Sequence, residues 1–102
     1  MNKYEEQFHQ IANDLLNASE GKLFGALSIK ANNGKTAAFL WENKMVFKLD
    51  EKSQKQALEL DGACTGTHIY SPEKQMKGWI SIPEQHMEVW AKFAGKAVIF
   101  VS

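Results

Sequence analysis

The sequence contains no arginine. All twelve of its basic residues are lysines, and twelve acidic residues balance them to a net charge of zero. Specific recognition of nucleic acids usually relies on arginine for bidentate contacts, on a domain that is basic overall. The composition therefore argues against a specific nucleic-acid partner.

Cysteine is almost as scarce, since Cys64 is the single one in the chain. One cysteine excludes an internal disulfide, and a chain without disulfides fits a reducing cytoplasm. No apolar run approaches the roughly 20 residues that span a bilayer, and the first residues lack the apolar segment of a signal peptide. We therefore expect a cytoplasmic protein with no membrane partner.

What the sequence does contain is the composition of an ordinary globular protein. In a chain of 102 residues, 44% are hydrophobic and 24% are charged, which is typical of a folded domain rather than a disordered one. A chain of this length forms one domain around one hydrophobic core. We therefore treat residues 1–102 as a single domain.

Residues 23–49 predict a three-stranded antiparallel meander. Strands are expected over residues 23–31, 36–42 and 45–49, where the side chains of the two faces alternate. Asn33-Gly34 is a strong signal for a two-residue hairpin turn, and Asn43-Lys44 predicts a second turn. The three strands should therefore pair in chain order.

The two turns also predict the register of this meander. The first turn pairs Ile29 with Ala38, and the second pairs Leu40 with Phe47. Because successive side chains point to opposite faces, each pairing assigns a whole strand. The aliphatic face, expected to form the core, contains Leu23, Gly25, Leu27, Ile29, Ala38, Leu40, Met45, Phe47 and Leu49. The second face contains Phe24, Ala26, Ser28, Lys30, Ala37, Phe39, Trp41, Val46 and Lys48.

Three helices are predicted around these strands. An apolar stripe at helical spacing predicts a helix from Lys3 to Glu20, stopped by Gly21. Asp50 is placed to cap a second helix that ends near Leu60. Pro83, favoured at the first position of a helix, begins the last one. The apolar side of the last helix contains Met87, Trp90, Phe93, Ala94, Ala97, Val98, Phe100 and Val101.

Two more strands complete the predicted sheet. They cover Thr67–Tyr70 and Gly78–Ile82, separated by a polar loop at Lys74–Lys77, and Ile80 and Ile82 should point into the core. The element order is helix, three strands, helix, two strands, helix. It predicts an α+β fold in two layers, with a five-stranded antiparallel sheet covered by helices on one face.

Only two pairs of residues invite a chemical interpretation. Glu5 and His9, four apart, are either half of a metal site or a solvated helix pair, and zinc needs three or four ligands. Cys64 and His68 are either a thiol–imidazole pair or a small buried cysteine beside a histidine at the rim, and no third group orients them. We therefore predict no catalytic residue, no metal site, no cofactor and no enzymatic activity.

The candidate binding surface is the second face of the meander. It consists of Phe24, Phe39, Trp41, Val46 and, from the fifth strand, Trp79. If every helix covers the aliphatic face, these side chains have no cover from their own chain, and such patches usually mark an interface. Homodimerisation is the simplest version, because a twofold contact needs one self-complementary patch. Alternatively, the loop around residue 74 or a chain end covers the patch as a minor second core.

The strands resemble those of a known family. The resemblance is carried by Leu23-Phe24-Gly25, Thr36-Ala37-Ala38-Phe39-Leu40-Trp41, Met45-Val46-Phe47-Lys48-Leu49 and Met76-Lys77-Gly78-Trp79-Ile80-Ser81-Ile82-Pro83. In order and spacing these segments are similar to the N-terminal domain of TfoX/Sxy-type proteins, over nearly the whole chain. The YjbR-like families are the next best match.

The resemblance implies a secretion-chaperone-like fold in a bacterial protein. The named members regulate natural competence and carry a second, C-terminal domain. Because the resemblance covers only their N-terminal domain, a stand-alone TfoX N-terminal-like domain is expected here. The family supplies no catalytic residues. The expected function is a non-catalytic regulatory or protein-interaction module, acting on a protein partner or on itself, with a link to competence regulation as one version. The alternative is a small-molecule binding domain that uses the aromatic face or a crevice between helices and sheet.

Overall fold

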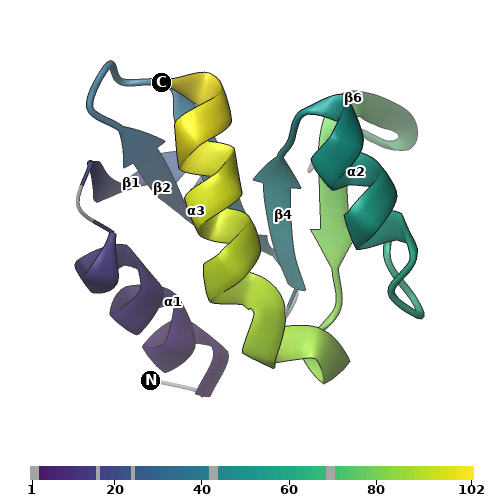
Figure 1. The fold of residues 1–102 in the computed structure, drawn as a ribbon, viewed down its shortest axis with the longest axis horizontal. Coiled ribbons are helices and arrows are strands. Elements are labelled where there is room, and N and C mark those ends of the chain that lie inside the picture. Colours follow the sequence, from purple (N-terminus) through teal and green to yellow (C-terminus); the bar gives the residue numbers. More distant parts are fainter. Residues whose placement is uncertain (1–2, 16, 24, 42–43, 69–70) are drawn as a thin grey trace.

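The computed structural model describes residues 3–15, 17–23, 25–41, 44–68 and 71–102 (Figure 1). The strands are β1 (Ala18–Leu23), β2 (Ala26–Ala31), β3 (Thr36–Trp41), β4 (Lys44–Lys48), β5 (Cys64–His68) and β6 (Ser71–Ile82). The helices are α1 (Lys3–Asp14), α2 (Glu51–Leu58) and α3 (Trp90–Val101), and a 3-10 helix, η1 (Glu84–Val89), comes directly before α3. The described part of the chain is thus an α+β fold with six strands and three α-helices, which confirms the predicted class but corrects the predicted five strands.

All six strands form one antiparallel sheet in the order β1-β2-β3-β4-β6-β5. In Figure 1, α3 crosses in front of the middle of the sheet, with α1 on one side and α2 on the other. The core between these layers contains Phe8, Ile11, Ile29, Ala38, Met45, Phe47, Leu49, Ile80, Ile82, Trp90, Phe93, Ala94 and Val98, all buried. The aliphatic face of the meander therefore forms the core, as predicted.

The first helix is shorter than predicted. It ends at Asp14, and residues 18–23 form β1, antiparallel to β2. Gly25, with φ of +84°, lies in the turn between these strands, so the predicted strand over residues 23–31 is interrupted there. The pairing of β1 with β2 gives hydrogen-bond partners to a row of backbone N–H and C=O groups. These bonds favour a strand after Asp14, although apolar residues at helical spacing continue to Leu15.

The turn between β2 and β3 has three residues instead of the predicted two. Ala31 donates its N–H to Lys35 O at 2.9 Å, and Gly34 takes a φ of +86°. A register shift between Ile29 and Lys30 then compensates, so Ile29 still pairs with Ala38. Ala37, predicted on the second face, is fully buried and belongs to the core cluster instead.

The β3–β4 register differs from the prediction by two residues. Leu40 pairs with Met45 rather than with Phe47, and Lys44, predicted in the turn, already pairs with Trp41. A shift of two residues leaves every side chain on its predicted face. Residues 42–43 lie outside the described residues.

The C-terminal hairpin is longer than predicted. β5 begins at Cys64 rather than Thr67, and β6 includes residues 74–77, which were predicted as a loop. The β5–β6 ladder has register shifts, and Gly78 has a φ of +84°. These irregularities hide the alternating pattern of a strand in the sequence. Ile80 and Ile82 point into the core, as predicted.

The last helical segment begins with a kink that the sequence analysis did not predict. Pro83 precedes η1, His86 departs from helical geometry with φ of −113°, and α3 begins only at Trp90. Trp90 is fully buried and donates its Nε1–H to Ile82 O at 3.2 Å. In the described part of the chain, no helix is both long enough and apolar enough to cross a membrane.

Candidate interaction surfaces

The second face of the sheet brings three of the predicted surface residues together. Phe39 of β3 pairs with Val46 of β4, and Val46 lies opposite Ser81 of β6. The rings of Phe39 and Trp79 lie 5.4 Å apart between centroids, tilted by 52°. These residues therefore form one contact group, as the register analysis predicted.

This group is not the bare patch that was expected. Phe39 is 1% exposed and Val46 5%, so both are buried within the chain itself. Trp79 is half-buried, while Trp41, at the end of β3, keeps 37% of its surface exposed. Phe24 lies outside the described residues. The prediction of a bare apolar patch is thus wrong for Phe39 and Val46, which lie in a second buried layer.

The curvature of the sheet accounts for part of this cover. A Cβ built on Gly66 of β5 would lie 2.9 Å from Val46 Cγ1 and 3.3 Å from Trp79 Cβ. In a flat sheet, β5 and β4 would lie about 10 Å apart, because β6 separates them. Such a close approach requires the sheet to bend toward its second face, and Gly66 permits it by having no side chain.

Two small polar side chains are buried on the same face. Ser28 is fully buried and Ser81 is 8% exposed. The Ser28 hydroxyl has no hydrogen-bond partner among the described residues. At the edge of this face, Lys48 Nζ lies 5.7 Å from the centroid of the Trp79 ring, in cation–π contact. The second face therefore combines aromatic rings with one unsatisfied hydroxyl.

Two polar side-chain contacts join α1 to neighbouring elements. His9 of α1 contacts Glu20 of β1, with Nδ1 2.7 Å from Oε1. A hydrogen bond to Glu84 raises the pKa of Tyr4 and links α1 to η1. Cys64 is exposed, which contradicts its interpretation as a small buried cysteine. Within the described residues, no three or more possible metal ligands gather around Glu5 and His9 or elsewhere.

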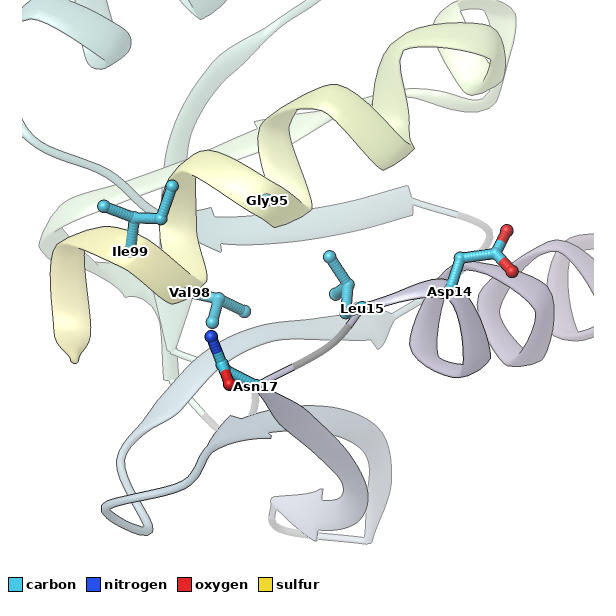
Figure 2. A pocket seen from close by; sticks show the side chains of 6 residues that line it. All are labelled: Asp14, Leu15, Asn17, Gly95, Val98 and Ile99. Atoms are coloured by element: carbon cyan, nitrogen blue, oxygen red, sulfur yellow. The ribbon is translucent and has the colours of Figure 1, made fainter.

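A groove runs between α3 and the segment that joins α1 to β1 (Figure 2). Its volume is about 280 Å³, and it is lined by Asp14, Leu15, Asn17, Gly95, Val98 and Ile99. Leu15 and Asn17 point toward α3, and Asp14 lies at one end. Outside its own helix backbone and its chain neighbours, no described atom lies within 4 Å of a Cβ built on Gly95. The absence of a side chain at Gly95 therefore helps to keep the groove open.

A second hollow of about 240 Å³ adjoins the first, since Asn17 lines both. Its other lining residues are Asn32, Asn33 and Ser102. Asn33 donates its Nδ2–H to Val101 O at 2.9 Å, which ties the β2–β3 turn to the end of α3. The groove is therefore apolar along α3 and lined by amides at the C-terminal end of that helix.

The groove lies between the C-terminal ends of two helices. α1 ends at Asp14 and α3 at Val101, and neither helix has a basic residue in its last turn. The C-terminus of a helix carries a partial negative charge, to which the Asp14 carboxylate adds. Among the described residues that line the two hollows, Asp14 is the only one with an ionisable side chain. The groove is therefore electronegative.

Beside this groove, α3 exposes two large apolar side chains in succession. Ile99 is 78% exposed and Phe100 is 45% exposed. The sequence analysis missed this surface because it assigned Phe100 to the buried side of the helix and gave no role to Ile99. The signal that was present is Gly95, a glycine inside a helix, which points to a need for space at that position.

No protein-family model, curated protein or solved structure matches this chain at a significant level. The similarity to TfoX/Sxy-type domains therefore remains an expectation from the sequence.

Proposed function

We propose that this protein is a non-catalytic protein-interaction module that binds its partner along α3, through the groove together with Ile99 and Phe100. The observation that supports this proposal is the 78% exposure of Ile99 beside an open apolar groove on the same helix. Contact with a partner would remove this apolar surface from water, which is favourable. The non-catalytic part of the proposal rests on the sequence, which has no catalytic motif.

The partner that fits this groove is a peptide segment with an aliphatic side chain close to a lysine or arginine. Leu15, Gly95 and Val98 provide an apolar site for the aliphatic side chain. The negative helix ends and the Asp14 carboxylate favour a cation next to it. The side-chain amides of the second hollow are suited to hydrogen bonding with a peptide backbone.

A random peptide display library, screened against the immobilised chain, tests this proposal. We expect the selected peptides to share an aliphatic residue near a basic one. Their binding should be lost in Gly95→Leu, which places a side chain in the groove. Leu58→Gln is the matched control, because Leu58 is exposed on α2, outside the lining of the groove. Failure to select any peptide, or equal binding to Gly95→Leu, would contradict the proposal.

A regulatory role is the finer version of the same proposal. It is supported by the similarity of the strand segments to TfoX/Sxy N-terminal domains, together with the secretion-chaperone-like fold, the cytoplasmic location and the link to competence regulation that this similarity implies. A non-catalytic peptide-binding module would act in regulation by bringing proteins into a complex rather than by modifying them chemically. Deletion of the gene, followed by measurement of DNA uptake, tests the competence version separately.

A second candidate function is the binding of a small molecule at the second face of the sheet. The observation that favours it is the Ser28 hydroxyl, fully buried and without a partner among the described residues, on the face that carries Phe39 and Trp79. An unpaired buried hydroxyl costs free energy that a ligand acceptor or donor would recover. A thermal-shift screen of metabolites against wild type and Ser28→Ala tests it. A true ligand stabilises the wild type and loses this effect in Ser28→Ala.

A further inference from the structure

The outer edge of β1 is a second surface that is suited to a partner. The strand order places β1 at one edge of the sheet, next to β2 alone (Figure 1). Ser19, Glu20 and Lys22 are exposed, and no other segment in the described part of the chain pairs with this edge. An edge strand offers a row of backbone donors and acceptors to any strand that can align with it.

The pairing of β1 with β2 determines which groups point outward. The two strands pair from Leu23↔Ala26 back to Ala18↔Ala31. In a two-residue hairpin the closing pair exchanges its backbone hydrogen bonds, and in an antiparallel ladder such pairs alternate along the strand. Leu23, Gly21 and Ser19 therefore direct their N–H and C=O groups to β2. The N–H and C=O groups of Glu20 and Lys22 therefore point away from β2, outward from the free edge of the sheet.

We propose that two copies of this chain associate by antiparallel pairing of β1 with β1, on a twofold axis at Gly21. Outward-pointing residues must face each other, so the central alignments are Glu20 with Glu20, Lys22 with Lys22, or Glu20 with Lys22. The first two place like charges opposite each other, which is unfavourable in a sheet. Only the third aligns opposite charges, and the twofold axis produces that pair twice.

The side chains around the axis are compatible with this register. Glu20 contacts His9 through Oε1, which leaves Oε2 to accept from Lys22 of the second copy. Gly21 puts no side chain at the axis, where the strands approach most closely. The stem of Lys30 lies over Gly21, with Cε 2.9 Å from the position of a Cβ built there. Two Lys30 side chains thus meet near the axis, and their repulsion makes the association weaker than it would be without them.

This association does not use the groove along α3 and goes beyond the proposed function. The occupant of the edge is a second copy, because the order of charges on β1 is complementary to itself when the strand is reversed. A strand from a different protein is the competing occupant. Charge-reversal variants of Glu20 and Lys22 distinguish self-association from the binding of another protein's strand.

Sedimentation velocity of the full chain over a range of concentrations tests the proposal. Glu20→Lys and Lys22→Glu each place like charges across the axis, and we expect each to weaken self-association by about tenfold. An equimolar mixture of these two variants should associate as well as the wild type, because each strand then faces one of opposite charge. Lys30→Gln, which removes the like charges near the axis, should tighten the association. Circular dichroism reports whether each variant is folded.

Lys52→Glu is the matched control, since it reverses an exposed charge on α2, away from β1. Its self-association should equal that of the wild type. A wild type that stays monomeric at its highest soluble concentration overturns the proposal. So does a dimer that tolerates both β1 variants, or a mixture of the variants that fails to associate.

Discussion

Two glycines in this chain, Gly66 and Gly95, have opposite surroundings. A Cβ on Gly66 would meet Val46 Cγ1 at 2.9 Å and Trp79 O at 3.4 Å, where two strands approach each other. A Cβ on Gly95 would meet no described atom within 4 Å outside its own helix backbone and chain neighbours. Gly66 is therefore required by packing, whereas Gly95 lies in open space in the lining of the groove, where a small side chain can be added without a clash.

Alanine at these two glycines should change stability in opposite directions. Gly66→Ala should destabilise by roughly 1–3 kcal/mol, because a well-packed site must shift to admit a methyl group. Gly95→Ala should stabilise by up to about 1 kcal/mol, because alanine is the better helix former. Urea denaturation measures both. A Gly66→Ala variant as stable as the wild type would mean that the sheet does not bend over Val46 as described.

Asp50 gives the chain a defined pH dependence. The N–H of Ser53 donates to Asp50 Oδ1 at 2.7 Å, and this hydrogen bond lowers the pKa of Asp50 below its ordinary value. The pKa of Asp50 is lower in the folded state than in the unfolded state, so its ionised form stabilises the fold fully at pH values above its ordinary pKa. This stabilisation is lost as the pH falls through the pKa that Asp50 has in the folded state.

The variant Asp50→Asn separates this effect from other titrations. Asparagine keeps an oxygen that accepts the Ser53 N–H but carries no titrating charge. We expect the melting temperature of the wild type to fall further than that of Asp50→Asn as the pH is lowered into the acid range. Thermal melts at a series of pH values measure this. Parallel curves for the two proteins would contradict the assignment.

At the scale of elements, the sequence predicts long-patterned segments better than their ends. The meander was predicted because both of its turns are signalled and because its faces survive a register error of two residues, as at Leu40. β1 was missed because the apolar spacing of α1 continues to Leu15, and the turn at Gly25 depends on pairing with β2. The bulge that moves Ala37 into the core also depends on that ladder, so local pattern does not reveal it.

The junction between β6 and α3 depends on one buried side chain. Trp90 is fully buried, and its Nε1–H donates to Ile82 O at 3.2 Å. Trp90→Phe should destabilise by roughly 1–3 kcal/mol, because it leaves a buried carbonyl without its donor and removes part of the ring. Trp41→Phe, at a partly exposed position, is the control and should change stability little. Equal urea midpoints for the two variants would show that the hydrogen bond contributes nothing.

At the scale of the whole molecule, the sequence identified which residues share a face but not which faces are covered. Phe39, Val46 and Trp79 were grouped correctly from register alone, because alternation is a local property. Their burial depends on the bend of the sheet at Gly66, which alternation does not encode. The groove along α3 escaped prediction for the same reason, since it depends on how α1 and α3 lie against each other.

The burial of both faces leads to the last prediction. Phe47, on the helix-covered face, is 0% exposed, and Phe39, on the second face, is 1% exposed. If both layers are core, Phe39→Ala and Phe47→Ala should each destabilise by about 3–5 kcal/mol, the usual cost of removing a buried ring. Trp41→Lys, at the exposed end of the second face, should cost less than about 1 kcal/mol. Urea denaturation of the three variants decides the matter: a large loss for Phe47→Ala beside a negligible one for Phe39→Ala would mean that the second face lies open to a partner after all.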